Sequence, residues 1–366
     1  MKIRRPPGIG ARLRWIISLG LIASSCLIID SAPRITERRV DQLASADGWS
    51  VLNFETRNLA SATSSVFAQI WSGPARQDPT ELRDFLRGPL GADLSREARL
   101  LTSIVTDQLR AGQVEAVGGA VFPPLAFALA PPPRLLVVSP RERIEVSHSV
   151  LLRDDLPLAE LDRVERTIER LGVSAFVVDS VAIATYPTLI PPDLSPRSAI
   201  RTIAHEWTHV ALFFTPLGQA YGTSVEARSI NEATADLVGE EVLAGVLQAA
   251  GEPTGEKRAP VDQEASTLLR EIRARAEALL SSGHVAAAEA AMEEGRKDLE
   301  SRGYRFRRLN QAFFAFYGSY TEGPGASQEI PDRLRELRLS STSINELLAR
   351  VGQIVTMDQL RRTRAE

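Results

Sequence analysis

The segment His205–His209, which reads HEWTH, constrains this 366-residue chain more than any other part of its sequence. In an α-helix, residues four positions apart lie on one face, one turn from each other. A helix through this segment would therefore aim the imidazoles of His205 and His209 at one point. Two imidazoles in that arrangement form a clamp for a metal ion, so the first expectation is a metal site built on a helix.

A second motif contains Asn231, Glu232 and Asp236. A catalytic zinc ion commonly takes three protein ligands and leaves its fourth position to water. Glu232 would supply the third ligand, and Glu206 would stand beside the metal as a general base. Asp236 lies four residues beyond Glu232 on the same helical face, where it would accept the outer ring proton of a liganding histidine. The two motifs together predict one zinc ion (Zn2+) per chain.

The local sequence predicts that both motifs lie inside helices. Ser195 before Pro196 indicates the start of the first helix, and the apolar residues that follow carry it to about Thr215. Thr223 and Glu226 predict a capping box at the start of the second helix. The loop between the helices is short, so we expect them to lie antiparallel with the two motifs close together.

Taken together, the motifs resemble the gluzincin division of the zinc metallopeptidases, whose best-known members are thermolysin-like. The resemblance extends over about residues 195–242. It implies a zincin-like domain in which two histidines and a glutamate bind zinc, a second glutamate is the general base, and two polar residues support the ligands. In that order, these residues are His205, His209, Glu232, Glu206, Asp236 and Asn231. The Gly-Ala-Met-Glu-Asn signature of the related aminopeptidases is absent from the sequence, which argues against that branch.

Zincins usually add a tyrosine or histidine that stabilises the oxyanion of the transition state. The candidates in this chain are Tyr221, His284, Tyr317 and Tyr320. We expect Tyr317 to have this role, because it lies in an aromatic-rich predicted helix downstream of Glu232.

The predicted function is that of a zinc metallopeptidase whose substrate is a peptide or protein. Four alternatives remain open. The histidines could be ordinary helix residues beside a solvated acidic face, or the zinc could be structural with a fourth ligand from His148, His284 or Cys26. The domain could also be an inactive zincin that serves as a binding or scaffold protein. Finally, it could be a zinc amidase that acts on a component of the cell envelope.

The amino-acid composition bounds the fold and the classes of partner that we expect. Hydrophobic residues make up 44% of the chain, which is enough for a globular core. The formal net charge is -3, so the chain lacks the basic excess of a nucleic-acid-binding protein, and we expect no nucleic-acid partner. The single cysteine, Cys26, excludes an intramolecular disulfide.

The N-terminus predicts membrane attachment. Residues 15–29 carry no charge and follow a basic stretch. The combination of a long N-terminal arm with the sequence His-Glu-Trp at residues 205–207 also resembles uncharacterised bacterial membrane-tethered proteins that share the zincin signature. Residues 1–32 are therefore expected to be a single-pass signal anchor, with the catalytic domain outside the cytoplasm. The alternative is a signal that is cleaved before Cys26, which would release a secreted protein.

The remaining pattern predicts an α+β fold that is predominantly helical. Residues 33–113 read as helical arms, and residues 114–366 as the zincin-like domain. Strands at residues 135–138, 144–152 and 175–190 would form a small sheet before the first zinc helix. The resemblance to zincins implies that residues 182–188 are an exposed edge that pairs with extended substrate, and an ordinary buried hairpin is the alternative. Within residues 261–302, two charged, alanine-rich helices separated by Ser281, Ser282 and Gly283 predict a helical hairpin.

Overall fold

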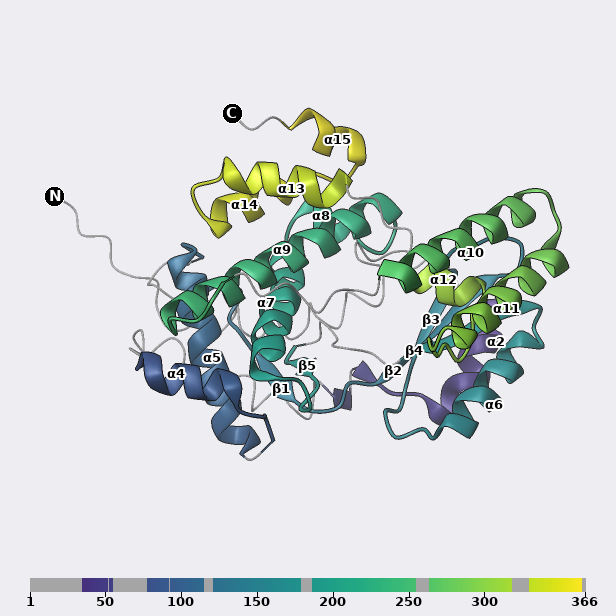
Figure 1. The fold of residues 1–366 in the computed structure, drawn as a ribbon, viewed down its shortest axis with the longest axis horizontal. Helices are drawn as coiled ribbons and strands as arrows, with labels where there is room; N and C mark the ends of the chain where they lie inside the picture. Colours follow the sequence, from purple (N-terminus) through teal and green to yellow (C-terminus); the bar gives the residue numbers. More distant parts are fainter. Residues whose placement is uncertain are drawn as a thin grey trace.

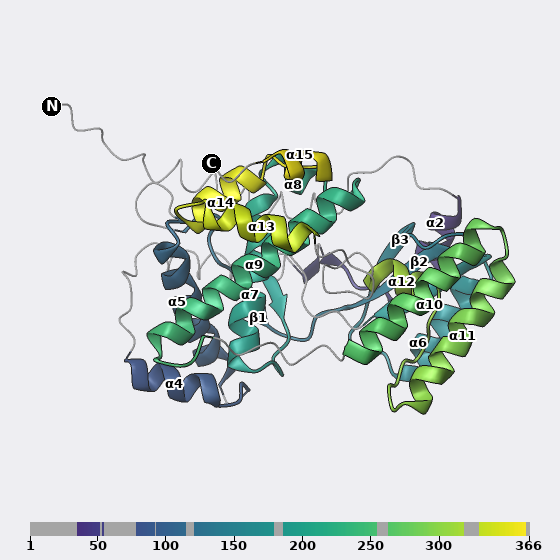
Figure 2. The ribbon, with the colours of Figure 1, turned by 45° about the horizontal axis from the view of Figure 1, so that its top comes forward.

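The computed structural model describes residues 35–51, 53–54, 78–91, 93–114, 121–178, 186–254, 263–317 and 329–363. The described chain is mostly helical and has a small amount of β-structure, which confirms the predicted α+β class. The views in Figures 1 and 2 show two groups of elements, which we call the helical lobe and the sheet lobe.

The helical lobe carries both predicted metal-binding motifs. Its elements are α4 (Pro79–Arg87), α5 (Leu94–Ala111), β1 (Phe127–Leu129), β5 (Thr188–Ile190), α7 (Pro196–Leu212), α8 (Pro216–Gln219), α9 (Val225–Ala249), α13 (Glu329–Leu339), α14 (Ile344–Val351) and α15 (Met357–Arg362). One continuous hydrophobic core joins these helices. The C-terminal helices pack over α9, so the end of the chain helps to hold the segment that carries the second motif.

The sheet lobe is built around three antiparallel strands in the order β3-β2-β4. Its elements are α2 (Ile35–Ala44), β2 (Arg134–Pro140), β3 (His148–Leu152), α6 (Leu158–Glu169), β4 (Val173–Val178), α10 (Gln263–Ser281), α11 (Val285–Ser301) and α12 (Gln311–Tyr317). Successive side chains of a strand point to opposite faces of a sheet. Leu136 and Val138 therefore pack with α2 and α6, whereas Val137 packs with α10, α11 and α12.

The helices that carry the motifs differ from the prediction at the end of α7 and at the start of α9, and a short helix lies between them. Ser195 caps α7 and Pro196 is its first residue, as expected, but α7 ends at Leu212 rather than near Thr215. The short helix α8 occupies part of the predicted loop. The predicted capping box at Thr223 is wrong, because the hydroxyl of Ser224 accepts the amide of Ala227 and α9 begins one residue later.

The prediction of a transmembrane anchor is wrong for the part of the chain that the structure describes. None of its described helices is long and apolar enough to cross a membrane. Residues 15–29, from which the prediction was made, lie outside the described residues. The predicted membrane attachment, and the extracytoplasmic location that depended on it, therefore have no support in the described residues.

The predicted substrate-binding edge is only partly described. Residues 182–185 lie outside the described residues, and β5 contains the end of the predicted segment. β5 pairs in parallel with β1, and all three of its side chains are buried. β5 precedes α7 directly, so this short sheet leads into the helix that carries the histidines.

Candidate metal centre

Helix α7 positions three of the predicted site residues. Ile203 and Trp207 bury one side of the helix in the core, and the indole of Trp207 donates a hydrogen bond to the carbonyl of Pro123 at 2.8 Å. His205 and His209 lie on another face, one turn apart. Their Nε2 atoms are 3.0 Å from each other. Two imidazole nitrogens at this distance need a proton or a cation between them, because each otherwise presents a lone pair to the other.

Helix α9 brings Glu232 against the same two nitrogens. The Oε2 atom of Glu232 lies 3.5 Å from Nε2 of His205 and 3.6 Å from Nε2 of His209. The helices approach closely because Gly239 has no side chain. A Cβ at that position would lie 2.8 Å from the carbonyl oxygen of Arg201 and 3.5 Å from Cβ of His205. The glycine therefore sets the distance across which Glu232 faces the histidines.

The outer nitrogen of each imidazole has its own acceptor. Nδ1 of His205 lies 3.0 Å from Oδ1 of Asp236, and Nδ1 of His209 lies 2.7 Å from Oδ1 of Asn231. A carboxylate or amide oxygen can only accept, so each Nδ1 carries the donated proton. This tautomer leaves the Nε2 lone pair of each ring directed at the common point.

The separations of these three atoms fit a metal site. In a tetrahedral zinc site with bonds of about 2.0–2.1 Å, ligand atoms lie roughly 3.3–3.4 Å apart. The observed separations of 3.0, 3.5 and 3.6 Å are close to that value. In addition, Oε2 of Glu232 is buried and has no hydrogen-bond partner in the described structure. A buried carboxylate oxygen without a partner is costly unless it binds a cation.

Glu206 is a second carboxylate at the site. One of its oxygens and one nitrogen of each histidine lie within 4.8 Å of one another, so His205, Glu206 and His209 could hold a metal ion. Its position differs from that of Glu232, which is in ion-pair range of both imidazoles. Glu206 forms no ion pair or hydrogen bond with any residue in the described ranges, although it is only 8% exposed. Burial raises the pKa of Glu206 above its usual value.

Interactions among the ionisable side chains of the site shift their pKa values strongly. Burial works to lower the pKa of His205, but the nearby carboxylates of Asp236 and Glu232 outweigh it and raise this pKa to about 10. Burial works to raise the pKa of Glu232, but His209, His205 and the hydroxyl of Tyr221 lower it to about 2. The carboxylates of this buried site therefore strongly stabilise a positive charge at the histidines.

The structure brings together every predicted site residue except Tyr317. Tyr317 lies on α12 in the sheet lobe, where its ring packs against Phe313 and Phe176 at centroid distances of 4.7 and 6.4 Å. Figures 1 and 2 show α12 beside the sheet and apart from α7 and α9. The aromatic spacing that suggested a site residue instead builds the core on one face of the sheet.

The other three candidates for the oxyanion role are His284, Tyr320 and Tyr221. His284 precedes α11 in the sheet lobe, and Tyr320 lies outside the described residues. Among the described candidates, Tyr221 contacts the site: its hydroxyl donates a hydrogen bond of 2.5 Å to Oε1 of Glu232, and its ring lies 5.8 Å from that of His209. No family model, no curated protein and no solved structure matches the chain.

Proposed function

We propose that this protein is a zinc-dependent hydrolase that cleaves peptide bonds. The observation that carries the proposal is the convergence of three atoms on one buried point: Nε2 of His205, Nε2 of His209 and Oε2 of Glu232. Separate acceptors orient the two imidazoles, which is the support that liganding histidines receive in metalloenzymes. The resemblance of the two motifs to those of gluzincins points in the same direction.

Zinc is the ion that the donor set favours. Two imidazole nitrogens and one carboxylate oxygen form a typical catalytic zinc set, which leaves one position for water. Magnesium and calcium prefer sites made of oxygen ligands. The carboxylates of Glu206 and Asp236 add further negative charge close to a divalent cation.

In the proposed reaction, Glu206 moves the proton. Bound zinc would supply a water molecule that is acidic enough to react near neutral pH. The carboxylate of Glu206 takes a proton from the attacking water, and no hydrogen bond from another described residue competes for it. Because burial raises the pKa of Glu206, the carboxyl group can hold that proton and donate it to the nitrogen of the leaving amine. A peptide bond has the leaving amine that this proton return requires.

The test is peptide cleavage by the purified full-length chain, with a peptide mixture analysed by mass spectrometry. We expect cleavage that a chelator abolishes and added zinc restores. Glu206→Gln should retain zinc but lose about 100- to 10,000-fold in kcat/KM, the usual contribution of a general base. The matched control is Glu240→Gln, because Glu240 is a half-exposed residue of α9 that pairs with Arg201.

Two results would contradict the proposal. Metal binding without cleavage of any peptide would indicate a binding protein. Chelator-sensitive cleavage of cell-envelope amides without cleavage of peptides would indicate an amidase.

A further inference from the structure

Tyr221 divides the carboxylate of Glu232 into two unlike oxygens. Oε1 accepts the hydrogen bond of 2.5 Å from the tyrosine hydroxyl. Oε2 is buried without a hydrogen-bond partner in the described structure and faces the Nε2 atoms of both histidines. A carboxylate can bind a metal through one oxygen or through both, and here one oxygen already has a partner.

The ring of Tyr221 contacts one residue that precedes it in the chain, His209, and one that follows it, Arg228. Its edge-to-face contact with His209 has an interplanar angle of 71°. The guanidinium of Arg228 lies over the ring at 5.6 Å from its centroid, and Nε of Arg228 also donates to the carbonyl of Tyr221 at 3.4 Å. Cation-π contacts of this kind add modest stabilisation. The hydroxyl therefore has little freedom to leave Glu232.

The segment that carries Tyr221 is also anchored to the C-terminal helices. The amide of Leu217 in α8 donates to the carbonyl of Gly352 at 3.0 Å, and the side chain of Leu217 is fully buried. At the start of α9, the carboxylate of Glu226 accepts the amide of Met357 at 3.1 Å. Tyr221 lies between these two attachments, so its position is set by the fold of the lobe.

We propose that Tyr221 is a positioning residue that makes Glu232 a one-oxygen metal ligand. By holding Oε1, the hydroxyl leaves only Oε2 for the ion and keeps a coordination position open for water. This inference rests on the metal binding of the proposed function. It concerns the way in which Glu232 binds, and it differs from the oxyanion role for which tyrosines were considered from the sequence.

The test replaces Tyr221 by phenylalanine and uses cobalt(II) as the probe. Four-coordinate cobalt(II) absorbs visible light more strongly than five-coordinate cobalt(II), so the spectrum reports how many ligand atoms bind. We expect the wild-type protein to show the strong, four-coordinate spectrum and Tyr221→Phe the weaker, five-coordinate one. Zinc affinity, measured by competition with a chromophoric chelator, should fall about 10- to 100-fold, the usual effect of removing a partner of a ligand.

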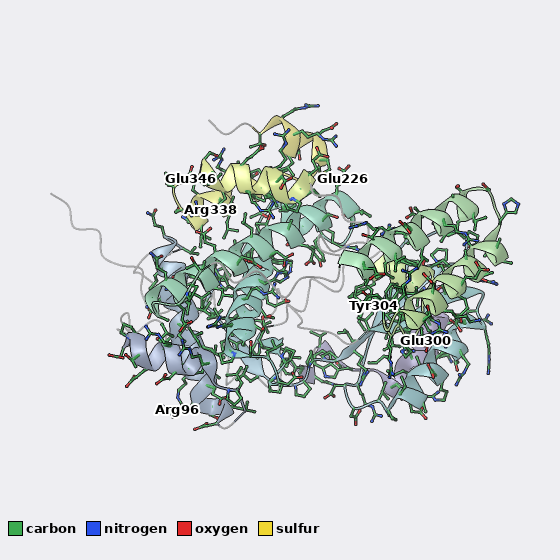
Figure 3. All side chains as sticks on the ribbon, viewed as in Figure 1. Arg96, Glu226, Glu300, Tyr304, Arg338 and Glu346 are labelled. Atoms are coloured by element: carbon green, nitrogen blue, oxygen red, sulfur yellow. The ribbon has the colours of Figure 1, made fainter. Side chains whose placement is uncertain are left out.

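The matched control is Tyr304→Phe. Tyr304 lies in the sheet lobe, as Figure 3 shows, and its hydroxyl also donates to a carboxylate, that of Glu264 at 3.4 Å. This variant removes the same chemical group and the same kind of hydrogen bond at a distance from the histidines. Its cobalt spectrum and zinc affinity should equal those of the wild-type protein.

A double-mutant cycle separates positioning from a general structural effect. If Tyr221 acts through Glu232, Tyr221→Phe should change the residual metal affinity of Glu232→Ala by less than about twofold. A loss of affinity of the same size in both backgrounds would overturn the inference. Cooperative thermal unfolding of the chelator-treated Tyr221→Phe protein would show that the variant is folded, and its midpoint should lie below that of Tyr304→Phe because the buried Oε1 of Glu232 loses its donor.

Two further outcomes would overturn the inference about Tyr221, and a third would overturn the proposed function. An unchanged cobalt spectrum in Tyr221→Phe would overturn the inference, whether or not affinity falls. Unchanged affinity with a lower kcat/KM would show that the hydroxyl serves the substrate, which overturns the inference and leaves the proposed function intact. Failure of the wild-type protein to bind cobalt or zinc would instead overturn the proposed function itself.

Discussion

Each lobe buries a glutamate, and the two glutamates are treated in opposite ways. In the sheet lobe, Glu165 is fully buried, and its carboxylate accepts hydrogen bonds from the amide of Val177 and the guanidinium of Arg307 and forms an ion pair with Arg308. In the helical lobe, Glu232 is 3% exposed, yet its Oε2 lacks a hydrogen-bond partner in the described structure and faces two imidazole nitrogens.

This difference distinguishes a carboxylate that stabilises the fold from one that we propose binds a metal ion. A buried charge is tolerated when donors surround it, as they surround Glu165. A buried carboxylate oxygen that is left without a donor needs another source of positive charge. The comparison therefore predicts that substitutions at the two positions will affect different properties of the protein.

The largest effect is expected from removing the ligands of the helical lobe. His209→Ala and Glu232→Ala should each weaken zinc binding by more than about 100-fold, because the loss of an outer partner alone costs 10- to 100-fold. Metal content after dialysis, measured by mass spectrometry, would check this. Zinc retained at the wild-type level in either variant would remove that residue from the site.

The corresponding change in the sheet lobe should affect stability and leave the metal in place. Glu165→Ala removes the buried carboxylate that two arginines share, and it should lower the free energy of unfolding by about 3 kcal/mol. This is the lower end of the range for buried pairs, because both arginines keep 23% of their side-chain surface exposed and can be rehydrated. Chemical denaturation provides the measurement. If zinc content of the folded variant also fell, the two lobes would not be separable in this way.

A smaller effect is expected where the helices of the site approach each other. A methyl group in Gly239→Ala would press on the carbonyl of Arg201, and the resulting shift of α9 should weaken zinc binding about 10-fold. Gly245→Ala is the control on the same helix, because its methyl group would meet only the flexible end of Gln108. Equal zinc affinities for the two variants would show that the helix spacing at Gly239 does not set the site.

A different kind of effect is the pH dependence of the stability of the chelator-treated protein. The pKa of His205 rises from 6.5 to about 10 on folding, so His205 contributes stability that is fully present below pH 6.5. That contribution is lost as pH rises toward 10, with a slope of at most about 1.4 kcal/mol per pH unit. Denaturation curves between pH 6.5 and 10 would measure it. A His205→Gln variant should lack this slope, and an equal slope in that variant would assign the effect to another group.

The sequence predicted what depends on local spacing. Helical periodicity and the cap at Ser195 predicted α7, and the four-residue interval predicted that His205 and His209 share a face. The predominantly helical α+β class also followed from such patterns. The helix boundaries near Thr223 were wrong by one residue, because a neighbouring serine was equally able to cap the helix.

Features that depend on tertiary contacts were not predictable in the same way. An aromatic helix such as the one that contains Tyr317 has the same pattern whether it lines a site or a core, and here it packs on the sheet. The contact of Tyr221 with Glu232 depends on the path of the segment around α8, so the sequence offered Tyr221 only as one of four candidates. The close approach at Gly239 likewise has no sequence signal of its own.

The most direct test of the central claim is the zinc K-edge X-ray absorption spectrum of the zinc-loaded protein. We expect one zinc ion per chain with two imidazole nitrogens and carboxylate and water oxygens at about 2.0–2.1 Å. A spectrum without imidazole scattering, or a chain that takes up no zinc, would contradict it.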